Sequence, residues 1–255
     1  MLRVRIIPIL LLQGNSLVKT IRYKKANYIG DPSNTCRIFN ELEVDELCFL
    51  DITVSQQKTD LNFSILEEIS NECFMPVSYG GGIDSIKKAE KVFKIGFEKV
   101  VINSALFSNP NLIGLLAKEF GSQAVVASVD VKKNFWGTYE VYAQHGSLNK
   151  KKHPAEFVKE LEGMGAGEIL LNNIDREGTW EGFDIDLIKL VSDSTELPVV
   201  AHGGAASLAD ISKVVAEGKA SAVALGSMVV YQAKGMGVLI KFPDKLELEK
   251  ALKKE

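Results

Sequence analysis

Short apolar runs of strand length alternate with amphipathic stretches of helical length along the whole chain. Alternation of this kind favours a parallel sheet in which a helix follows every strand. The predicted strands are Arg5–Leu11, Glu46–Asp51, Pro76–Tyr79, Lys99–Ile102, Ala124–Asp130, Glu168–Asn172, Pro198–Ala201 and Ala222–Leu225. The predicted helices are Asn34–Leu42, Ile65–Asn71, Ser85–Ile95, Asn111–Phe120, Pro154–Met164, Ile185–Ser194, Leu208–Glu217 and Lys245–Lys254.

These alternating elements, in a chain of 255 residues, suit a closed barrel, which commonly takes about 250 residues as one domain. The structural rival is an open doubly wound sheet. Such a sheet would be expected to show a glycine-rich turn after its first strand, and Leu10–Gln13 is not one. We therefore predict that residues 1–255 form a single α/β domain, a (β/α)8 TIM barrel.

An internal repeat supports closure. Tyr79–Ile83 resembles Ala201–Ala205, and Val101–Ala105 resembles Ala224–Met228, with the two members of each pair about half a chain apart. Asp51 and Asp175 form a third match in the same order. A repeat of this period predicts two duplicated half-barrels.

Composition narrows the class of protein. The formal net charge of −3 and a pI near 5.8 argue against an obligate nucleic-acid partner. No apolar run approaches 18 residues, so we expect no membrane span, and the apolar start Met1–Leu12 is predicted to be a core strand rather than a signal peptide. Three cysteines without a close pair in the sequence (Cys36, Cys48 and Cys73) give no disulfide or metal signal and favour the reducing cytoplasm. The histidines lie apart without ligand spacing, so we expect neither metal nor cofactor.

Glycine-rich turns follow the predicted strands in both halves. Backbone N–H groups at such turns can hold a phosphate, and barrels favour the loops after strands seven and eight for this purpose. The alternative is that the glycines serve only tight turns. The candidate phosphate residues are Gly203, Gly204, Gly226 and Ser227 in one half, and Gly82, Asn103 and Ser104 in the other.

Charged residues stand at both ends of the predicted strands. Asp130 ends the fifth strand, where it could act as a general base or cap the next segment. Lys19, after the first strand, could meet an anionic substrate or be solvated. The opposite strand ends carry Arg5, Glu46, Lys99 and Glu168. These four could neutralise one another inside the barrel floor, although solvated charges near loops are the favoured interpretation from the residues alone.

Several segments together resemble the HisF family, the cyclase subunit of imidazole glycerol phosphate synthase. They include Arg5–Pro8, Gly80–Ile83, Val101–Ser104 and Ile174–Thr179, and the resemblance runs from Met1 to about Ser227. The related HisA isomerases compete, but the Asp-Arg-x-Gly-Thr and Ile-Asn-Ser segments favour HisF.

The resemblance implies a HisH-type glutaminase docked on the barrel floor and ammonia passing through the barrel to the rim. It places Arg5, Glu46, Lys99 and Glu168 on the ring of charges that guards the ammonia entrance. It also implies a phosphorylated ligand at Lys19 and at the two sets of turn residues named above. Asp130 matches the family's second catalytic aspartate.

One departure from the family matters most. The family's first strand ends Cys-Leu-Asp-Val, and its aspartate is the partner acid for ring formation, whereas here the stretch is Ile9–Leu12 and Leu11 takes that position. Leucine can neither donate nor accept a proton, and loss of one member of an acid–base pair typically removes at least about 10²–10⁴ in rate. Further departures are Asn172-Asn173 for Thr-Ser, Glu177 for Asp and His202 for Ser.

The segments Leu10–Leu12, Leu17–Thr20 and Tyr28–Pro32 look like a second HisF-type subfamily. Those paralogues accompany a HisH-type glutaminase and an N-acetyl sugar amidotransferase in making amidino sugars for surface polysaccharides. We therefore expect an ammonia-channelling synthase subunit that supports amidation of an activated sugar. Two alternatives stay open: an authentic imidazole glycerol phosphate synthase cyclase, and a non-catalytic scaffold that activates the glutaminase and conducts ammonia.

Overall fold

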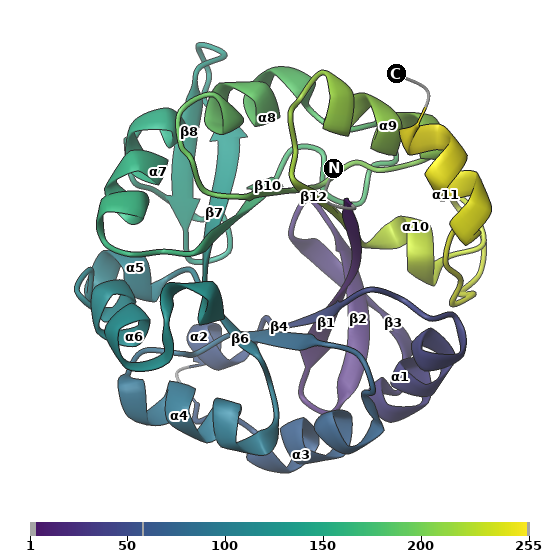
Figure 1. The fold of residues 1–255 in the computed structure, drawn as a ribbon, viewed down its shortest axis with the longest axis horizontal. Helices are drawn as coiled ribbons and strands as arrows, with labels where there is room; N and C mark the ends of the chain where they lie inside the picture. Colours follow the sequence, from purple (N-terminus) through teal and green to yellow (C-terminus); the bar gives the residue numbers. More distant parts are fainter. Residues whose placement is uncertain (1–3, 58, 254–255) are drawn as a thin grey trace.

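Eight parallel strands close into a barrel in the computed structural model, which describes residues 4–57 and 59–253 (Figure 1). Each strand pairs in parallel with its neighbours, and the pairing of β10 with β7 closes the circle. The predicted (β/α)8 barrel is thereby confirmed. The barrel strands are β1 (Arg5–Gln13), β4 (Leu47–Asp51), β5 (Val77–Gly80), β6 (Lys99–Ile102), β7 (Val125–Lys133), β10 (Glu168–Asn173), β11 (Val199–His202) and β12 (Ala222–Leu225).

Helices surround the barrel (Figure 1). Side chains that accept hydrogen bonds from backbone N–H groups fix where several of them begin, as expected of N-caps. Asp31 accepts from the N–H of Asn34, and Ser207 forms a reciprocal capping box with Asp210. The outer helices are α1 (Pro32–Glu41), α3 (Phe63–Glu72), α4 (Ile86–Ile95), α6 (Leu112–Phe120), α7 (Pro154–Gly163), α8 (Ile185–Ser192), α9 (Leu208–Ala216) and α11 (Lys245–Leu252). Shorter elements are α2 (Val54–Gln57), α5 (Ala105–Ser108), α10 (Ser227–Val230) and a 3-10 turn at Ser122–Ala124.

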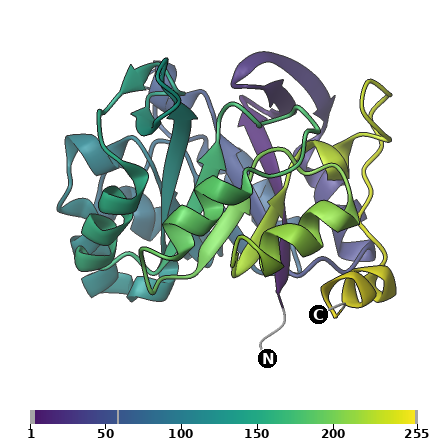
Figure 2. The ribbon, with the colours of Figure 1, turned by 90° about the horizontal axis from the view of Figure 1, so that it is seen from above.

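Two antiparallel additions were missing from the predicted elements. After β1, the chain forms the hairpin of β2 (Ser16–Ile21) and β3 (Lys24–Gly30), and β7 extends to Lys133 to pair with β8 (Tyr139–Ala143), which is followed by β9 (Leu148–Asn149). Figure 2 shows both additions at the end of the barrel opposite the N-terminus. This end carries the carboxyl ends of the parallel strands, so the hairpins form walls around the predicted ligand-binding rim.

The strands alternate between two apolar layers, as the period of two in a strand requires. Along β1, Ile6 and Leu10 pack outward against the helices, while Ile7, Ile9 and Leu11 point into the barrel. The inner layer is a separate cluster of buried, mostly aliphatic side chains: Ile7, Ile9, Leu11, Val18, Cys48, Val101, Val126, Leu170, Val200, Ala222 and Ala224. The middle of the barrel interior is therefore packed mainly with small and branched apolar groups.

The repeated glycine turns have matching backbones. Gly81 and its counterpart Gly203 have φ angles of 118° and 102°. A Cβ at Gly81 would lie 2.5 Å from the carbonyl oxygen of Asp51, and one at Gly203 would lie 2.8 Å from that of Asn173. Both halves thus need glycine where a turn passes close to the end of the preceding strand. This match supports the duplication, and it also gives these two glycines a purely structural reason.

The fold brings together two cysteines that are far apart in the sequence. Cys36, on α1, and Cys73, at the end of α3, have their sulfur atoms 3.4 Å apart, and both are free thiols. Spacing along the chain does not predict this pair, because the packing of α1 against α3 creates the contact. Among the described residues, no helix is long and apolar enough to cross a membrane.

Leu10 tests the outer core layer. Its side chain is fully buried, so Leu10→Ala should lower the free energy of unfolding by about 2–5 kcal/mol through lost apolar contact and a residual cavity. Leu115→Ala, at a helix position 46% exposed, is the matched control and should change it by about 0.5 kcal/mol or less. Urea unfolding followed by circular dichroism measures both. Equal effects of the two substitutions would contradict the packing described.

Candidate functional site at the barrel rim

A cavity of about 760 Å³ opens at the carboxyl ends of the strands. It brings together residues for which the sequence predicts two different roles: the phosphate-binding turn residues of the first half, and the aspartate at the end of the fifth predicted strand. Its lining includes Gly82, Asn103, Ser104 and Asp130. Leu11 also lines it, so the position where the family has its partner acid presents a methyl surface to the cavity.

Asp130 is buried and held by three polar side chains. The hydroxyl of Tyr23 donates to its Oδ1 at 2.7 Å, and Asn103 Nδ2 donates to its Oδ2 at 3.2 Å. Asn172 Nδ2 lies 3.5 Å from Oδ1. Burial raises the pKa of Asp130 to about 6, although these hydrogen bonds favour the charged form. A carboxyl group with that pKa can exchange a proton near neutral pH, as acid–base work requires.

Tyr23 is a site residue that the sequence analysis missed. It lies in the turn between β2 and β3 with a φ of 60°, and this turn places its side chain over the barrel mouth. Asn172 Nδ2 donates to its hydroxyl oxygen, while that hydroxyl donates to Asp130. Burial, followed by the Asp130 charge, raises the pKa of Tyr23 well above its usual value, so it stays a protonated donor. No motif marks this residue, because its partners are more than 100 positions away along the chain.

The second set of predicted phosphate residues surrounds a much smaller space. Lys19, Gly203, Gly204, Gly226 and Ser227 line a cavity of about 10 Å³, which is room for about one water molecule. The buried Lys19 ammonium donates to the Glu177 carboxylate and, at 2.9 Å, to the carbonyl oxygen of Thr20.

Lys19 is therefore paired in this conformation. Glu177, noted in the sequence only as a departure from the family, also accepts from Thr20 and from the N–H of Tyr23. Charge pairing of this kind is expected for a lysine and a glutamate buried together. Lys19 packs closely against Gly226, where a Cβ would lie 2.9 Å from Lys19 Cε, and the remaining space of about 10 Å³ is too small for a phosphate in this conformation.

His202 lies between the two cavities and lines both. Burial, together with the charge of Lys19, lowers the pKa of His202 to about 3. The imidazole is thus neutral at physiological pH and contributes hydrogen-bonding atoms without a positive charge.

Two other carboxylates could in principle replace the missing acid. Asp51 lines the cavity, but its Oδ1 accepts from Thr53 N, Thr53 Oγ1 and Val54 N at 2.8, 2.7 and 3.2 Å. Asp175 accepts from the N–H of Lys133 at 3.1 Å and is not among the residues lining the cavity. Asp51 is therefore held by its turn through Oδ1, and Asp175 is not among the residues that line the cavity.

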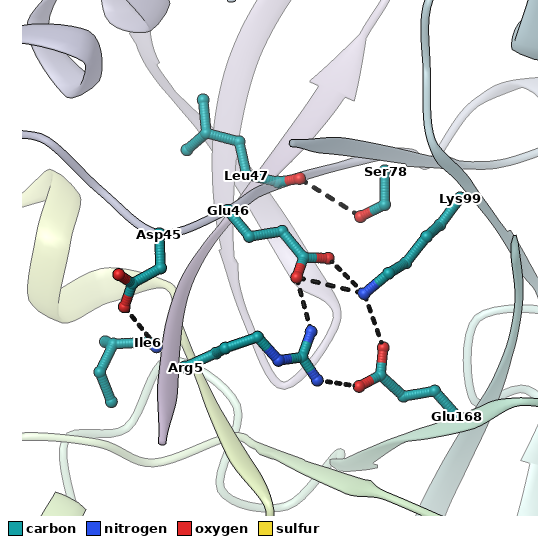
Figure 3. A network of polar contacts seen from close by, with 8 residues as sticks. All are labelled: Arg5, Ile6, Asp45, Glu46, Leu47, Ser78, Lys99 and Glu168. Atoms are coloured by element: carbon teal, nitrogen blue, oxygen red, sulfur yellow. Dashed lines mark hydrogen bonds and ion pairs between the residues drawn. The ribbon is translucent and has the colours of Figure 1, made fainter. Parts of the chain in front are cut away.

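The four charged residues at the strand starts form a closed ring on the barrel floor (Figure 3). Arg5 Nη1 lies 2.6 Å from Glu46 Oε2, and Arg5 Nη2 pairs with Glu168. Lys99 Nζ completes the ring, at 3.0 Å from Glu46 Oε1 and 3.1 Å from Glu168 Oε2. Each carboxylate thus contacts both cations, and the solvated arrangement favoured from the residues alone is not what the fold adopts. Burial explains this, since Glu46 and Glu168 are only 5% and 6% exposed.

The floor ring and the rim are joined by the apolar inner layer. The inward positions of β1 are Arg5 in the ring, then Ile7 and Ile9, then Leu11 at the rim cavity. The interior therefore changes from charged to apolar and then to polar along the barrel axis. Among residues 4–57 and 59–253, no group of three or more His, Cys, Asp or Glu side chains could hold a metal ion.

The raised pKa of Asp130 has a consequence for stability. Because its folded pKa (about 6) exceeds the usual 3.8, its contribution to stability is full at low pH and is lost as the pH rises through about 6. The difference corresponds to roughly 3 kcal/mol. The free energy of unfolding of Asp130→Asn, relative to that of the unchanged protein, should therefore increase by roughly 3 kcal/mol between about pH 4 and pH 8. Urea unfolding across this range measures it, with Asp60→Asn, an exposed carboxylate, as the control. Curves for Asp130→Asn and wild type that stay parallel would contradict the burial argument.

The chain matches a known protein family over most of its length. The model of the family described as histidine biosynthesis protein matches residues 5–234. A Pseudomonas aeruginosa protein, provisionally named as imidazole glycerol phosphate synthase subunit hisF2, is 46% identical over 98% of this chain and 99% of its own. A Vibrio vulnificus protein provisionally named hisF3 is 41% identical over 99% of this chain and 97% of its own. The imidazole glycerol phosphate synthase subunit HisF of Alkaliphilus metalliredigens is 37% identical over 91% of this chain and 92% of its own. The chain belongs to the histidine biosynthesis protein family and is a HisF-like barrel within it.

Proposed function

We propose that this chain is the synthase subunit of a glutamine amidotransferase complex and receives ammonia from a HisH-type glutaminase through its barrel. The observation that carries the proposal is the axial order of the interior: a closed ring of ion pairs at the floor, an apolar layer, then a polar rim. An ion crossing the apolar layer would lose its hydration without compensation, whereas neutral ammonia would lose far less. The interior thus favours a small uncharged molecule.

The acceptor of ammonia is inferred from the rim. Leu11 removes the acid that imidazole formation needs, while Asp130 keeps its hydrogen-bonded place. This combination favours amidation of a nucleotide-linked N-acetyl sugar, together with an N-acetyl sugar amidotransferase, in surface polysaccharide biosynthesis. The resemblance of Leu10–Leu12, Leu17–Thr20 and Tyr28–Pro32 to the second HisF-type subfamily supports this acceptor. The complex would work in the cytoplasm.

The rim is proposed to bind a phosphorylated ligand through the first-half residues Gly82, Asn103 and Ser104, where the cavity is open. Lys19, Gly203, Gly204, Gly226 and Ser227 would take part only after the Lys19–Glu177 pair opens. Because the second half is closed, the rim in this conformation is compatible with a ligand that is held by one phosphate, in the first half.

A second candidate is the cyclase activity itself, favoured by the names of the relatives. Without an acid at position 11, ring closure would depend on another proton donor, and Asp51 is already engaged by its own turn. Complementation of a histidine auxotroph that lacks its cyclase separates the two functions. We expect no growth of the auxotroph with this chain. Among its variants, we expect growth only with those that carry Leu11→Asp. Growth with the unchanged chain at the rate of the native cyclase would favour the second candidate.

Lys99 tests the ammonia entrance. Lys99→Met leaves Glu46 and Glu168 with Arg5 alone, and loss of one partner of a buried ion pair typically costs about 3–5 kcal/mol, so the ring should rearrange. We expect glutamine-supported amidation to fall by about tenfold or more, and ammonium-supported amidation to fall far less. Product formation with each nitrogen source measures both rates. Lys94→Met, on the exposed face of α4, is the control, and an equal loss with both nitrogen sources would contradict the entrance role.

Asp130 separates an enzyme from a passive conduit. Asp130→Asn keeps the shape of the side chain but removes the proton-exchanging group, so a rim that performs chemistry should lose about 10²–10⁴ in amidation rate. The glutaminase activity of the complex should be retained. If amidation by this variant equals that of the unchanged complex, the non-catalytic scaffold becomes the better account.

A further inference from the structure

Three hydrogen-bonding atoms of residues that line the rim cavity are buried without a partner among the residues that the structure describes. One is His145 Nε2, in the turn between β8 and β9. The other two, Asn172 Oδ1 and His202 Nδ1, lie on neighbouring barrel strands. Their residues are 4% and 7% exposed, and both line the rim cavity. Buried polar atoms are almost always hydrogen-bonded, because leaving one unpaired is unfavourable, so these two on neighbouring strands point to a ligand.

The sheet register places the two side chains next to each other. Asn172 on β10 pairs with His202 on β11, and both follow inward-facing residues of the apolar layer, Leu170 and Val200, at a spacing of two. They therefore stand on the inner wall of the barrel, one step above the end of the apolar layer.

The surrounding contacts keep these atoms free. Asn172 Nδ2 donates to the hydroxyl oxygen of Tyr23, and that hydroxyl donates to Asp130. The amide oxygen of Asn172 must therefore point away from Tyr23 and Asp130. Next to Asn172 Oδ1, Gly203 has no side chain, and a Cβ there would lie 3.4 Å from this oxygen. Lys19, whose charge acts on His202, is held by Glu177 and Thr20. Burial and the Lys19 charge keep the imidazole neutral, and a neutral ring has one nitrogen with a free lone pair.

We propose that Asn172 Oδ1 and His202 Nδ1 form a binding site for a small neutral hydrogen-bond donor, and that this donor is ammonia leaving the apolar interior. The choice of ammonia over water rests on the function proposed above. Ammonia has three N–H donors and one lone pair. Two acceptors on the wall would take two of these donors and leave the lone pair directed into the cavity, where an acceptor carbon would be attacked. The same site would hold ammonia beside Asp130 and Tyr23, and the neutral His202 ring carries no additional proton to transfer to it.

The site makes Tyr23 a positioning residue. Its hydroxyl fixes the orientation of the Asn172 amide and holds Asp130 at the same time. In Tyr23→Phe, the amide is free to rotate, and its nitrogen can replace its oxygen on the inner wall.

Nuclear magnetic resonance of the protein labelled with ¹⁵N-histidine tests the site directly, since His202 is one of three histidines and His202→Gln assigns its signal. The probe is ammonium chloride, titrated at rising pH so that the fraction of free ammonia increases. We expect the His202 ring to be the neutral tautomer with the proton on Nε2, and its Nδ1 signal to shift saturably with free ammonia. Sodium chloride at equal ionic strength, and trimethylamine, which has no N–H donor, should leave it unchanged.

Substitutions locate the binding. Asn172→Leu removes the second acceptor at similar volume and should weaken the saturable shift by about tenfold, the value of a net hydrogen bond of about 1–1.5 kcal/mol. Asn172→Ala serves if the leucine variant does not fold, and Asn27→Leu, on the exposed strand β3, is the matched control. Tyr23→Phe should weaken binding while leaving the His202 tautomer in place.

Several results would overturn the site: a proton on Nδ1, no response to ammonia, the same response to trimethylamine, or a shift unaffected by Asn172→Leu. The titration needs neither glutaminase nor sugar. If ammonia binds but the complex shows no glutamine-dependent amidation, the proposed function is rejected and the site stands. If amidation occurs but ammonia does not bind, the site is rejected and the proposed function stands.

Discussion

Closure of the parallel sheet is the constraint on which the other features depend. Once β10 pairs with β7, most inward side chains are removed from water, and a charge that is buried there must find a partner. At the floor, Arg5, Glu46, Lys99 and Glu168 meet this condition by pairing in a ring, and above them the inner layer is apolar. The proposed passage of a neutral molecule, rather than an ion, rests on this order of charged and apolar layers.

The same condition shapes the rim. Lys19 is buried with Glu177, and Asp130 is surrounded by neutral donors, among them Tyr23 and Asn103. The result is a rim whose two halves differ although their backbones are repeated: one half is an open cavity, and the other is closed by an ion pair. Side chains, and not the duplicated turns, therefore decide what each half can bind.

Much of this was accessible from the sequence, and the exceptions have physical causes. The strands Lys99–Ile102 and Ala222–Leu225 were predicted with their observed bounds, because buried strands carry continuous apolar runs. The hairpin strand β3 was missed because most of it is exposed and lacks alternation. The position of Asp130 followed from strand order, but its contact with Tyr23, and the closure of the Lys19 side of the rim, depend on a turn folding across the barrel mouth. Long-range contacts of this kind leave no local pattern.

The central claim is that nitrogen travels inside the barrel rather than through bulk solvent. In the most direct test, this chain is purified as a complex with its glutaminase and the sugar amidotransferase. The complex is then supplied with glutamine labelled with ¹⁵N in the side-chain amide, together with excess unlabelled ammonium. Mass spectrometry of the amidated sugar then reports the source of its nitrogen. The account predicts product that keeps the glutamine label. Product that carries the isotope ratio of the surrounding solution would contradict it.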